Sequence, residues 1–188
     1  MATQHPDNAN APYWKRDSAF INSADELREC YLNFDDLGCL EYMWDWEGKY
    51  VDEGIVDKLL KEYYDSFRRR PLGKECFLTL RIPRMDDRGN YPRVARAFMT
   101  MMTAEDLAAE LGMKHMPVFE IILPFTQEAK TLVKLRKKFA LATKFKKKVF
   151  PSSKAAGGNI ETIPLIEEVN NLVGSRKILE QYVGLHKK

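Results

Sequence analysis

The chain repeats one pattern that limits its fold more than any other feature. A short apolar run ends in polar or charged side chains, and a helix-like segment follows it. The residues at the ends of the four clear runs are Asp45, Glu47 and Lys49, then Arg81, then Thr126 and Gln127, and finally Glu167. Strands that alternate with helices predict an α/β fold with a parallel sheet and right-handed crossovers. Because parallel strands end at the same edge of a sheet, the pattern also predicts a site built from successive strand ends.

The spacing of apolar residues and of turn residues predicts the element boundaries. The expected strands cover 39–44, 76–82, 118–123 and 160–166, with at most a short further strand at the N-terminus. The expected helices cover 23–34, 52 to the stop at 71–73, 93–102, 103–112, 127–147 and the segment from 167 onward. Ser23 and Glu26 form a predicted capping box, Asp52 is a predicted cap, and Thr103 is predicted to open a separate helix. We expect the stretch 151–159, rich in Ser, Ala and Gly, to be the least ordered part of the chain.

Composition narrows the class of protein. A chain of 188 residues can bury one sizeable core, so we expect a single domain over 1–188. A net charge of +3 argues against a dedicated nucleic-acid binder. The three cysteines, Cys30, Cys39 and Cys76, have no metal-binding spacing and fit reduced thiols in a cytoplasmic protein. The sequence contains no secretion signal and no run of 18 apolar residues, so we expect no membrane partner.

The side chains at the strand ends suit one kind of chemistry. Carboxylates such as Asp45, Glu47 and Glu167 are suitable oxygen ligands for Mg²⁺, which takes one or two protein carboxylates together with substrate oxygens. Arg81 and Arg84 could hold a phosphate or a carboxylate with paired hydrogen bonds. Together they predict a small anionic substrate bound through a divalent metal ion.

Each of these residues also has an ordinary structural explanation. His5 could be a surface residue, Asp45 and Glu47 could cap the next helix, and Arg81 and Arg84 could be surface charges. Carboxylates such as Glu167 and Glu168 at the start of a helix are favourable for its dipole alone. The prediction of a site therefore depends on the coincidence of these residues at one edge of the sheet.

Two motifs carry a specific resemblance. Residues 3–8 are TQHPDN and residues 43–49 are MWDWEGK, and both are similar to segments found at the same places in the archaeal-type phosphoenolpyruvate carboxylases. Segments 71–74, 77–79, 81–83 and 163–167 also resemble family segments in the same order. The resemblance covers essentially the whole chain.

The resemblance implies a (β/α)8 barrel that joins phosphoenolpyruvate and bicarbonate to give oxaloacetate and phosphate with Mg²⁺ or Mn²⁺. His5 resembles the histidine that helps form carboxyphosphate and manages the enolate, and Arg81 resembles a strand-end arginine that faces the phosphate and bicarbonate oxygens. Glu167 resembles the first of two metal-binding carboxylates. Arg84 and Lys49 are placed as substrate-binding residues, and Asp45 and Glu47 are placed only in the region of the site.

The resemblance also implies that parts of the enzyme are missing. The second metal carboxylate of the family and its phosphate-binding Phe-Arg-Gly segment do not occur before Lys188. About four or five strands are expected here, whereas a full barrel needs eight. We therefore expect the N-terminal half of a barrel, as a fragment or a truncated gene product, with little or no carboxylase activity alone. An open sheet favours self-association, so we expect a homo-oligomer.

Three alternatives stay open at this point. Lys134 to Lys138 and Lys144 to Lys148 contribute eight basic residues on or near one helix, with Phe139 and Phe145 between them, which could bind RNA or phosphate. A solvated outer helix explains the same residues more simply. The chain could also be a non-catalytic barrel fragment that only binds partners, or another Mg²⁺-dependent barrel enzyme that handles an enolate.

Overall fold

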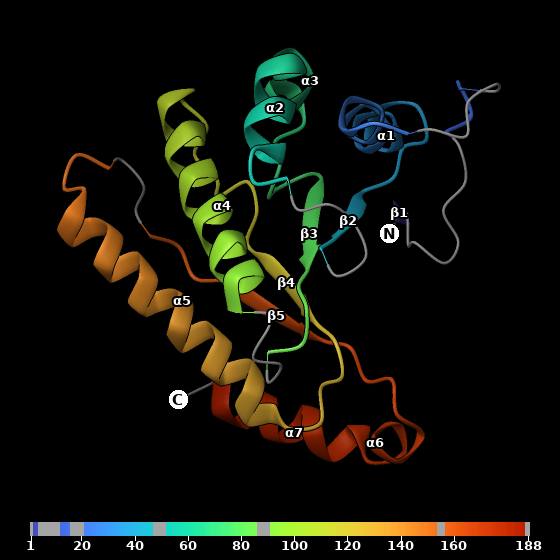
Figure 1. Ribbon diagram of the computed structural model, residues 1–188, viewed down its shortest axis with the longest axis vertical. Helices are drawn as coiled ribbons and strands as arrows, with labels where there is room; N and C mark the ends of the chain where they lie inside the picture. The colour runs from blue at the N-terminus through green and yellow to red at the C-terminus, as the bar shows by residue number, and fades with distance from the viewer. Residues whose placement is uncertain are drawn as a thin grey trace.

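The computed structural model describes residues 2–3, 12–15, 21–46, 52–85, 91–153 and 157–186. Its centre is a five-stranded sheet in the order β1-β2-β3-β4-β5, in which every neighbouring pair is parallel (Figure 1). The strands are β1 (Ala2–Thr3), β2 (Glu41–Asp45), β3 (Phe77–Arg81), β4 (Glu120–Leu123) and β5 (Glu161–Pro164). The helices are α1 (Ser23–Asp35), α2 (Ile55–Glu62), α3 (Tyr64–Arg69), α4 (Tyr91–Glu110), α5 (Ala129–Val149), α6 (Val169–Val173) and α7 (Ser175–His186).

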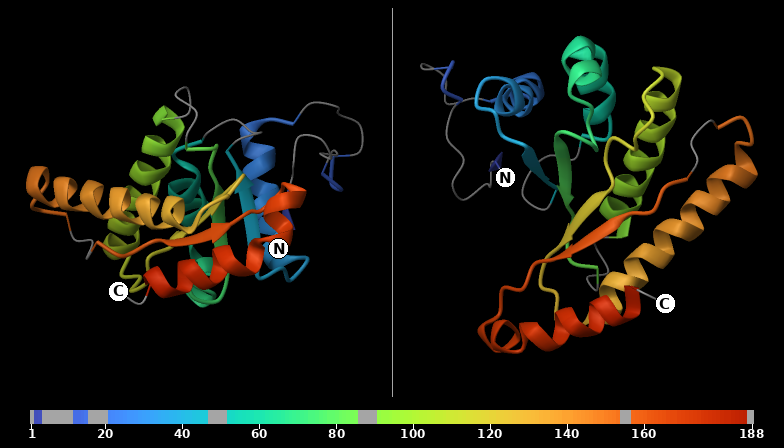
Figure 2. Two further views of the ribbon diagram at one scale, coloured as in Figure 1. Left: turned by 90° about the horizontal axis from the view of Figure 1, so that it is seen from below. Right: turned by 180° about the vertical axis from the view of Figure 1, so that it is seen from behind.

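The helices α1 to α5 follow one another in chain order along one face of the sheet, and α7 packs beside α5 (Figures 1 and 2). Side chains alternate between the two faces of a strand, which explains this layering. Tyr42, Trp44, Leu78 and Leu80 are at most 1% exposed and belong to the apolar core that the helices cover. The other face carries the polar set Glu41, Asp45, Thr79, Arg81 and Glu120, so the chemistry lies on the face without this helical layer.

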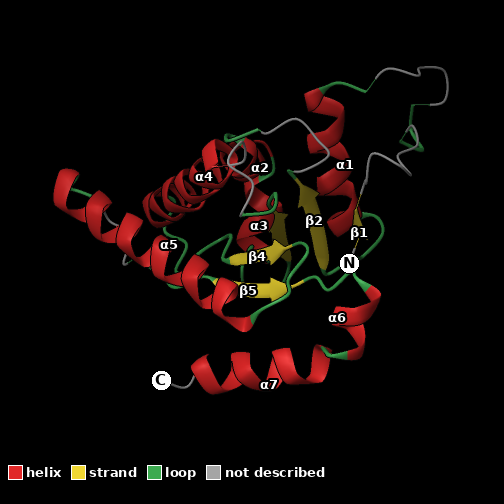
Figure 3. Ribbon diagram, turned by 60° about the horizontal axis from the view of Figure 1, so that its bottom comes forward, coloured by secondary structure: helices red, strands yellow, loops and turns green. Residues whose placement is uncertain are grey.

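The α/β class, the parallel sheet and the short N-terminal strand are confirmed. Strands follow one another in space as they do in the chain and every neighbouring pair is parallel, so their carboxyl ends share one edge of the sheet. Figure 3 shows the strands with the helices outside them. No helix among the described residues is long and apolar enough to cross a bilayer.

Two predicted helix caps were wrong. The first helix is capped by Asn22, whose side-chain oxygen accepts from the Asp25 backbone N–H, while the Asp25 carboxylate accepts from the Asn22 N–H. The capping box therefore lies one residue before the predicted pair of Ser23 and Glu26. Asp52 accepts from the Gly54 N–H and binds Lys58, but the N-cap position itself is Gly54.

Three helix boundaries also differ from the prediction. The helix expected from 52 breaks at Tyr63 into α2 and α3, and the last helix breaks at Gly174 into α6 and α7. The two helices expected between 93 and 112 are one continuous helix, α4. Thr103 lies inside it because its hydroxyl donates to the Met99 carbonyl one turn back and does not cap a new helix.

Candidate functional site

The ends of β2 and β3 place Asp45 and Arg81 side by side. The sheet register pairs these two residues, and the Arg81 Nη1 atom lies 2.8 Å from the Asp45 Oδ2 atom. The Asp45 side chain is 0% exposed and the Arg81 side chain 9% exposed. A hydrogen bond between two charged groups is short and strong when it is shielded from water. Arg81 is therefore not a surface charge, and Asp45 is not a helix cap.

Glu167 reaches the same place from the loop that follows β5. Its Oε1 atom lies 3.8 Å from the Arg81 Nη2 atom, and its Oε2 atom accepts a hydrogen bond of 3.0 Å from the Phe125 backbone N–H. About one third of the Glu167 side chain is exposed. The carboxylate thus joins the ends of three strands, and part of it remains accessible to a ligand.

The loop after β4 completes this edge of the sheet. Phe125 has a φ of 50°, the one positive value at a non-glycine residue in the described part of the chain. The Arg84 guanidinium lies 5.6 Å from the centre of the Phe125 ring, a cation–π contact. A cavity of about 120 Å³ lies here, lined by Arg84, Phe125, Gln127 and six neighbouring residues.

Further hydrogen bonds connect the loop after β4 to the loop after β5. The Thr126 backbone N–H donates to the Leu165 carbonyl at 3.0 Å, and the Gln127 side-chain amide donates to the Glu168 carboxylate at 3.1 Å. Glu168 occupies the N-cap position of α6, but its side chain makes no capping hydrogen bond. The sequence predicted that Thr126 and Gln127 stand at a strand end, but it gave no signal for the conformation of Phe125 or for the Gln127–Glu168 contact.

Several predicted site residues lie outside the described residues. They are His5, Glu47 and Lys49. β1 ends at Thr3, the first residue of the motif TQHPDN, and pairs with β2. The roles of His5, Glu47 and Lys49 stay predictions.

The described residues offer a limited set of metal ligands. No three His, Cys, Asp or Glu side chains in the described part of the chain are grouped closely enough to hold a metal ion. Of the two carboxylates beside Arg81, Asp45 is fully buried in its ion pair, whereas Glu167 is partly exposed and lies farther from the guanidinium. Mg²⁺ commonly binds through one or two protein carboxylates and takes its other ligands from substrate and water. Glu167 fits a metal held in that manner.

A second polar group lies nearer the start of the same strands. The Thr79 hydroxyl is a hydrogen-bond donor to Glu41 at 2.7 Å and to Glu120 at 3.2 Å. Burial raises the pKa of the Glu120 carboxyl, the hydrogen bond from Thr79 lowers it, and the charges of Glu41 and Glu161 raise it further; the net shift is upward. This group is separate from the ion pair of Asp45 and Arg81, because it lies two residues earlier on β3.

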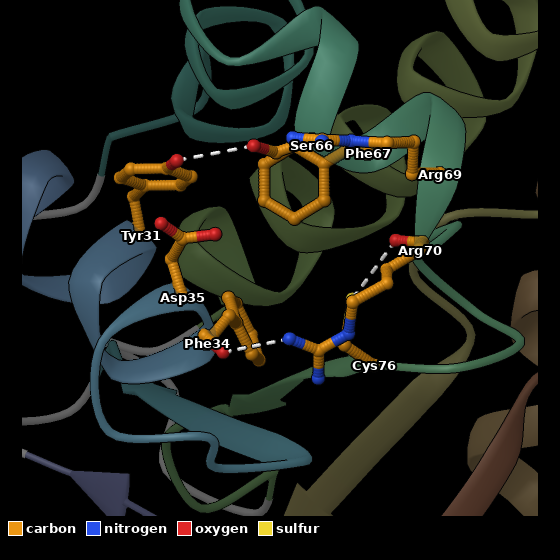
Figure 4. A pocket seen from close by; sticks show the side chains of 8 residues that line it. All are labelled: Tyr31, Phe34, Asp35, Ser66, Phe67, Arg69, Arg70 and Cys76. Carbon is orange, nitrogen blue, oxygen red and sulfur yellow. Dashed lines mark hydrogen bonds between the residues drawn. The ribbon is translucent and has the colours of Figure 1, made fainter.

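A cavity of about 310 Å³ lies away from the strand ends, between α1, α3 and the start of β3 (Figure 4). The Tyr31 and Ser66 hydroxyls are 3.0 Å apart, and the Arg70 guanidinium donates to the Phe34 carbonyl at 2.8 Å. Burial raises the pKa of the Cys76 thiol to about 11, so this thiol stays protonated at neutral pH. We assign the cavity no chemical role, since these polar groups already bond to one another.

Comparison with known proteins identifies the family of this chain. A sequence model described as phosphoenolpyruvate carboxylase matches residues 1–188. The chain belongs to the phosphoenolpyruvate carboxylase family.

Individual relatives agree with this family assignment. The chain is 39% identical to the phosphoenolpyruvate carboxylase of Oenococcus oeni, over all of this chain and 38% of the relative. It is 38% identical to the enzyme of Leuconostoc mesenteroides, over all of this chain and 37% of the relative. It is 34% identical to that of Methanothermobacter thermautotrophicus, over 97% of this chain and 40% of the relative. The chain thus spans about two fifths of the length of these phosphoenolpyruvate carboxylases.

Proposed function

We propose that this chain forms one side of a phosphoenolpyruvate carboxylase active site. The reaction joins phosphoenolpyruvate and bicarbonate to give oxaloacetate and phosphate. One observation carries the proposal: in a member of this family, a buried arginine is held by Asp45 and faces Glu167 where parallel strands end. Enzymes with such sheets place their chemistry at these ends.

The proposed architecture is the N-terminal half of a (β/α)8 barrel over 1–188. Five parallel strands in chain order, with their helices along one face, are compatible with consecutive units of such a barrel. A barrel needs eight strands, and the relatives have more than twice the length matched here. In this proposal, the other residues of the site correspond to the part of the relatives that this chain does not match.

Arg81 is the proposed anion-binding and charge-stabilising residue. In the first step a bicarbonate oxygen forms a bond to phosphorus, and the bond between phosphorus and the enol oxygen breaks, which gives carboxyphosphate and the enolate of pyruvate. Negative charge develops on the phosphoryl oxygens during this step. A guanidinium already fixed by Asp45 can stabilise that charge with little reorganisation. The enolate carbon then adds to CO₂ released from carboxyphosphate, which gives oxaloacetate and phosphate.

Arg84, His5 and Lys49 have proposed roles around this centre. Arg84 could bind a substrate carboxylate or phosphate beside the small cavity after β4. Lys49 is proposed as a second substrate-binding cation. His5 is proposed as the group that moves protons near the enolate, because a histidine side chain changes charge close to neutral pH.

Glu167 is the proposed metal ligand, with Mg²⁺ or Mn²⁺ as the ion. A bound divalent ion would supply Lewis-acid stabilisation of phosphoryl and enolate oxygens. The Glu167 carboxylate would then bind the metal ion and also accept the hydrogen bond from the Phe125 N–H. It would thereby connect the metal position to the loop after β4.

The test is oxaloacetate and phosphate formation from phosphoenolpyruvate, with and without bicarbonate and Mg²⁺. We expect little or no turnover by the 188-residue chain alone, since it carries only part of the proposed site. A chimera in which the chain replaces the matching 38% of the Oenococcus oeni enzyme is expected to turn over with both requirements. Turnover by the isolated chain would contradict the half-barrel part of the proposal. A folded chimera without turnover would contradict the proposal as a whole.

A further inference from the structure

Helix α5 has a charge that sets it apart from the rest of the molecule. It contains nine of the 30 Lys and Arg residues of the chain and none of the 27 Asp and Glu residues. The rest of the chain therefore has 21 basic and 27 acidic residues, a net charge of −6. A strong asymmetry of this kind points to a negatively charged partner.

Six of the nine basic residues of α5 lie on one face of the helix. We call this the outward face of α5. With 100° of rotation per residue, its members lie within an arc of about 140° around the helix axis. The residues of this outward face are Lys130, Lys134, Lys137, Lys138, Leu141, Lys144, Phe145, Lys148 and Val149, all of them exposed. Leu132, Leu135 and Phe139 lie on the opposite side, are at most 1% exposed and pack in the core. Figure 2 shows α5 along the outside of the molecule, so its outward face points away from the sheet.

The stability of the helix does not explain this arrangement. Lys130 stands in the first turn of α5, where the helix dipole favours acidic side chains. Lys130, Lys134 and Lys138 follow each other at intervals of four residues, and like charges at that spacing repel by a few tenths of a kcal/mol per pair. Of the nine basic residues, Lys146 is neutralised inside the fold, where it binds Asp106 at 2.5 Å.

The same face exposes large apolar side chains. Leu141 is 65% exposed, Phe145 68% and Val149 46%, and they follow one another at intervals of four residues. Phe150, the next residue after the helix, is 57% exposed. The outward face is therefore both cationic and apolar over the C-terminal half of α5.

We propose that the outward face of α5 binds an anionic lipid surface. Lysines beside a membrane gain attraction from acidic headgroups, and apolar side chains between them gain by entering the boundary of the acyl chains. RNA would use the lysines and could stack on Phe145, but it offers little to the aliphatic Leu141 and Val149. The expectation of no membrane partner rests on the absence of an apolar span, and a surface contact needs no span. The proposal does not depend on the proposed carboxylase activity.

The test is flotation of the purified chain with vesicles of phosphatidylcholine, with or without phosphatidylserine. We expect binding only to vesicles that contain phosphatidylserine, and weaker binding as salt is added. The variant K134Q/K138Q/K144Q/K148Q is expected to lose on the order of a hundredfold or more in affinity. The variant L141S/F145S is expected to lose the part of the binding that persists at high salt.

The matched control is K61Q/K74Q/K114Q/K177Q, which removes the same charge at exposed positions outside α5. It is expected to bind nearly as well as the unchanged chain. Circular dichroism and thermal unfolding establish that each variant is folded. No binding to phosphatidylserine vesicles at low salt, or equal losses in the control and the α5 variant, would overturn the proposal. Tighter binding to poly(U) RNA than to vesicles, unaffected by L141S/F145S, would overturn it in favour of a nucleic acid.

Discussion

Arg81 and Asp45 depend on each other in the proposed site. Both side chains are almost fully removed from water, and each neutralises the charge of the other at 2.8 Å. Removing one partner of a buried ion pair leaves an uncompensated charge, which commonly costs about 3–5 kcal/mol. We predict that Arg81→Gln lowers the free energy of unfolding by about this amount, measured by urea denaturation.

A double-variant cycle separates the pair from other effects of the substitution. The combination of Asp45→Asn with Arg81→Gln is expected to cost less than the sum of the two single changes, because neither residue is then left charged and buried. Arg176→Gln is the control, since Arg176 forms an exposed pair with Glu180 worth about 0–1 kcal/mol at most. Additive losses at Asp45 and Arg81 would contradict the coupling.

Glu120 provides a prediction about pH. Burial is the main reason that its pKa is raised in the folded chain, so the folded chain binds this proton more tightly than the unfolded chain does. Stability therefore falls as pH rises from the ordinary pKa of a glutamate through the raised one. We predict that Glu120→Gln is more stable than the unchanged chain at neutral pH.

This advantage should vanish in acid, below the ordinary pKa of a glutamate, where Glu120 is protonated in both the folded and the unfolded chain. Urea midpoints measured across this range check the prediction, with Glu110→Gln on the exposed surface of α4 as the control. An advantage that is equal at every pH would show that charge at Glu120 is not its cause.

Among the elements, the turn before β3 depends on one glycine. Gly73 has a φ of +79°, and a Cβ atom there would lie 2.0 Å from the Met116 carbonyl oxygen. Gly112, after α4, has a similar φ of +75° but no atom within 4 Å of its virtual Cβ. We predict that Gly112→Ala costs about 1–2 kcal/mol of stability from its backbone conformation alone. Gly73→Ala should cost clearly more, and equal thermal unfolding of the two variants would contradict this.

The sequence predicted the elements well where a regular pattern determines them. All four main strands overlap their predicted positions, because apolar runs bounded by Gly or Pro are a local signal. The helix breaks at Tyr63 and Gly174 were missed because the apolar spacing continues across both of them. The single α4 was missed because Thr103 can either cap a helix or bond to its own preceding turn, and only the surrounding packing decides between the two.

The candidate site was predictable in part for the same reason. Strand ends gather at one edge, so Asp45, Arg81 and Glu167 could be expected close together before any distance was known. The contacts between the loops at this edge of the sheet could not be predicted. The positive φ of Phe125 and the hydrogen bond from its N–H to Glu167 depend on how two loops, 42 residues apart in sequence, meet in space.

For the whole molecule, the two outer strands of the sheet are the places where further strands could pair. β1 and β5 each have one strand neighbour in the described part of the chain. Beyond β5, α6 exposes Val169 at 75%, Leu172 at 59% and Val173 at 85%. Unpaired sheet edges and exposed apolar surface favour association. We predict concentration-dependent self-association in sedimentation velocity.

The variant L172E/V173E should shift this equilibrium toward the monomer. Leu37→Glu places a charge at another exposed apolar residue, far from β5 in the sequence, and should leave the equilibrium unchanged. A chain that remains monomeric at every concentration would contradict the prediction.

The measurement that bears most directly on the proposed site is oxaloacetate formation by the Oenococcus oeni chimera with single arginine substitutions. Bicarbonate-dependent turnover should fall at least about a hundredfold in Arg81→Lys, because a lysine cannot keep the paired contacts to Asp45 and an oxyanion. Arg176→Gln should keep the activity of the unchanged chimera, since Arg176 lies on the exposed surface of α7. A chimera that folds and whose Arg81→Lys variant turns over as fast as the Arg176→Gln control would contradict the assignment of this strand-end arginine to the carboxylase site.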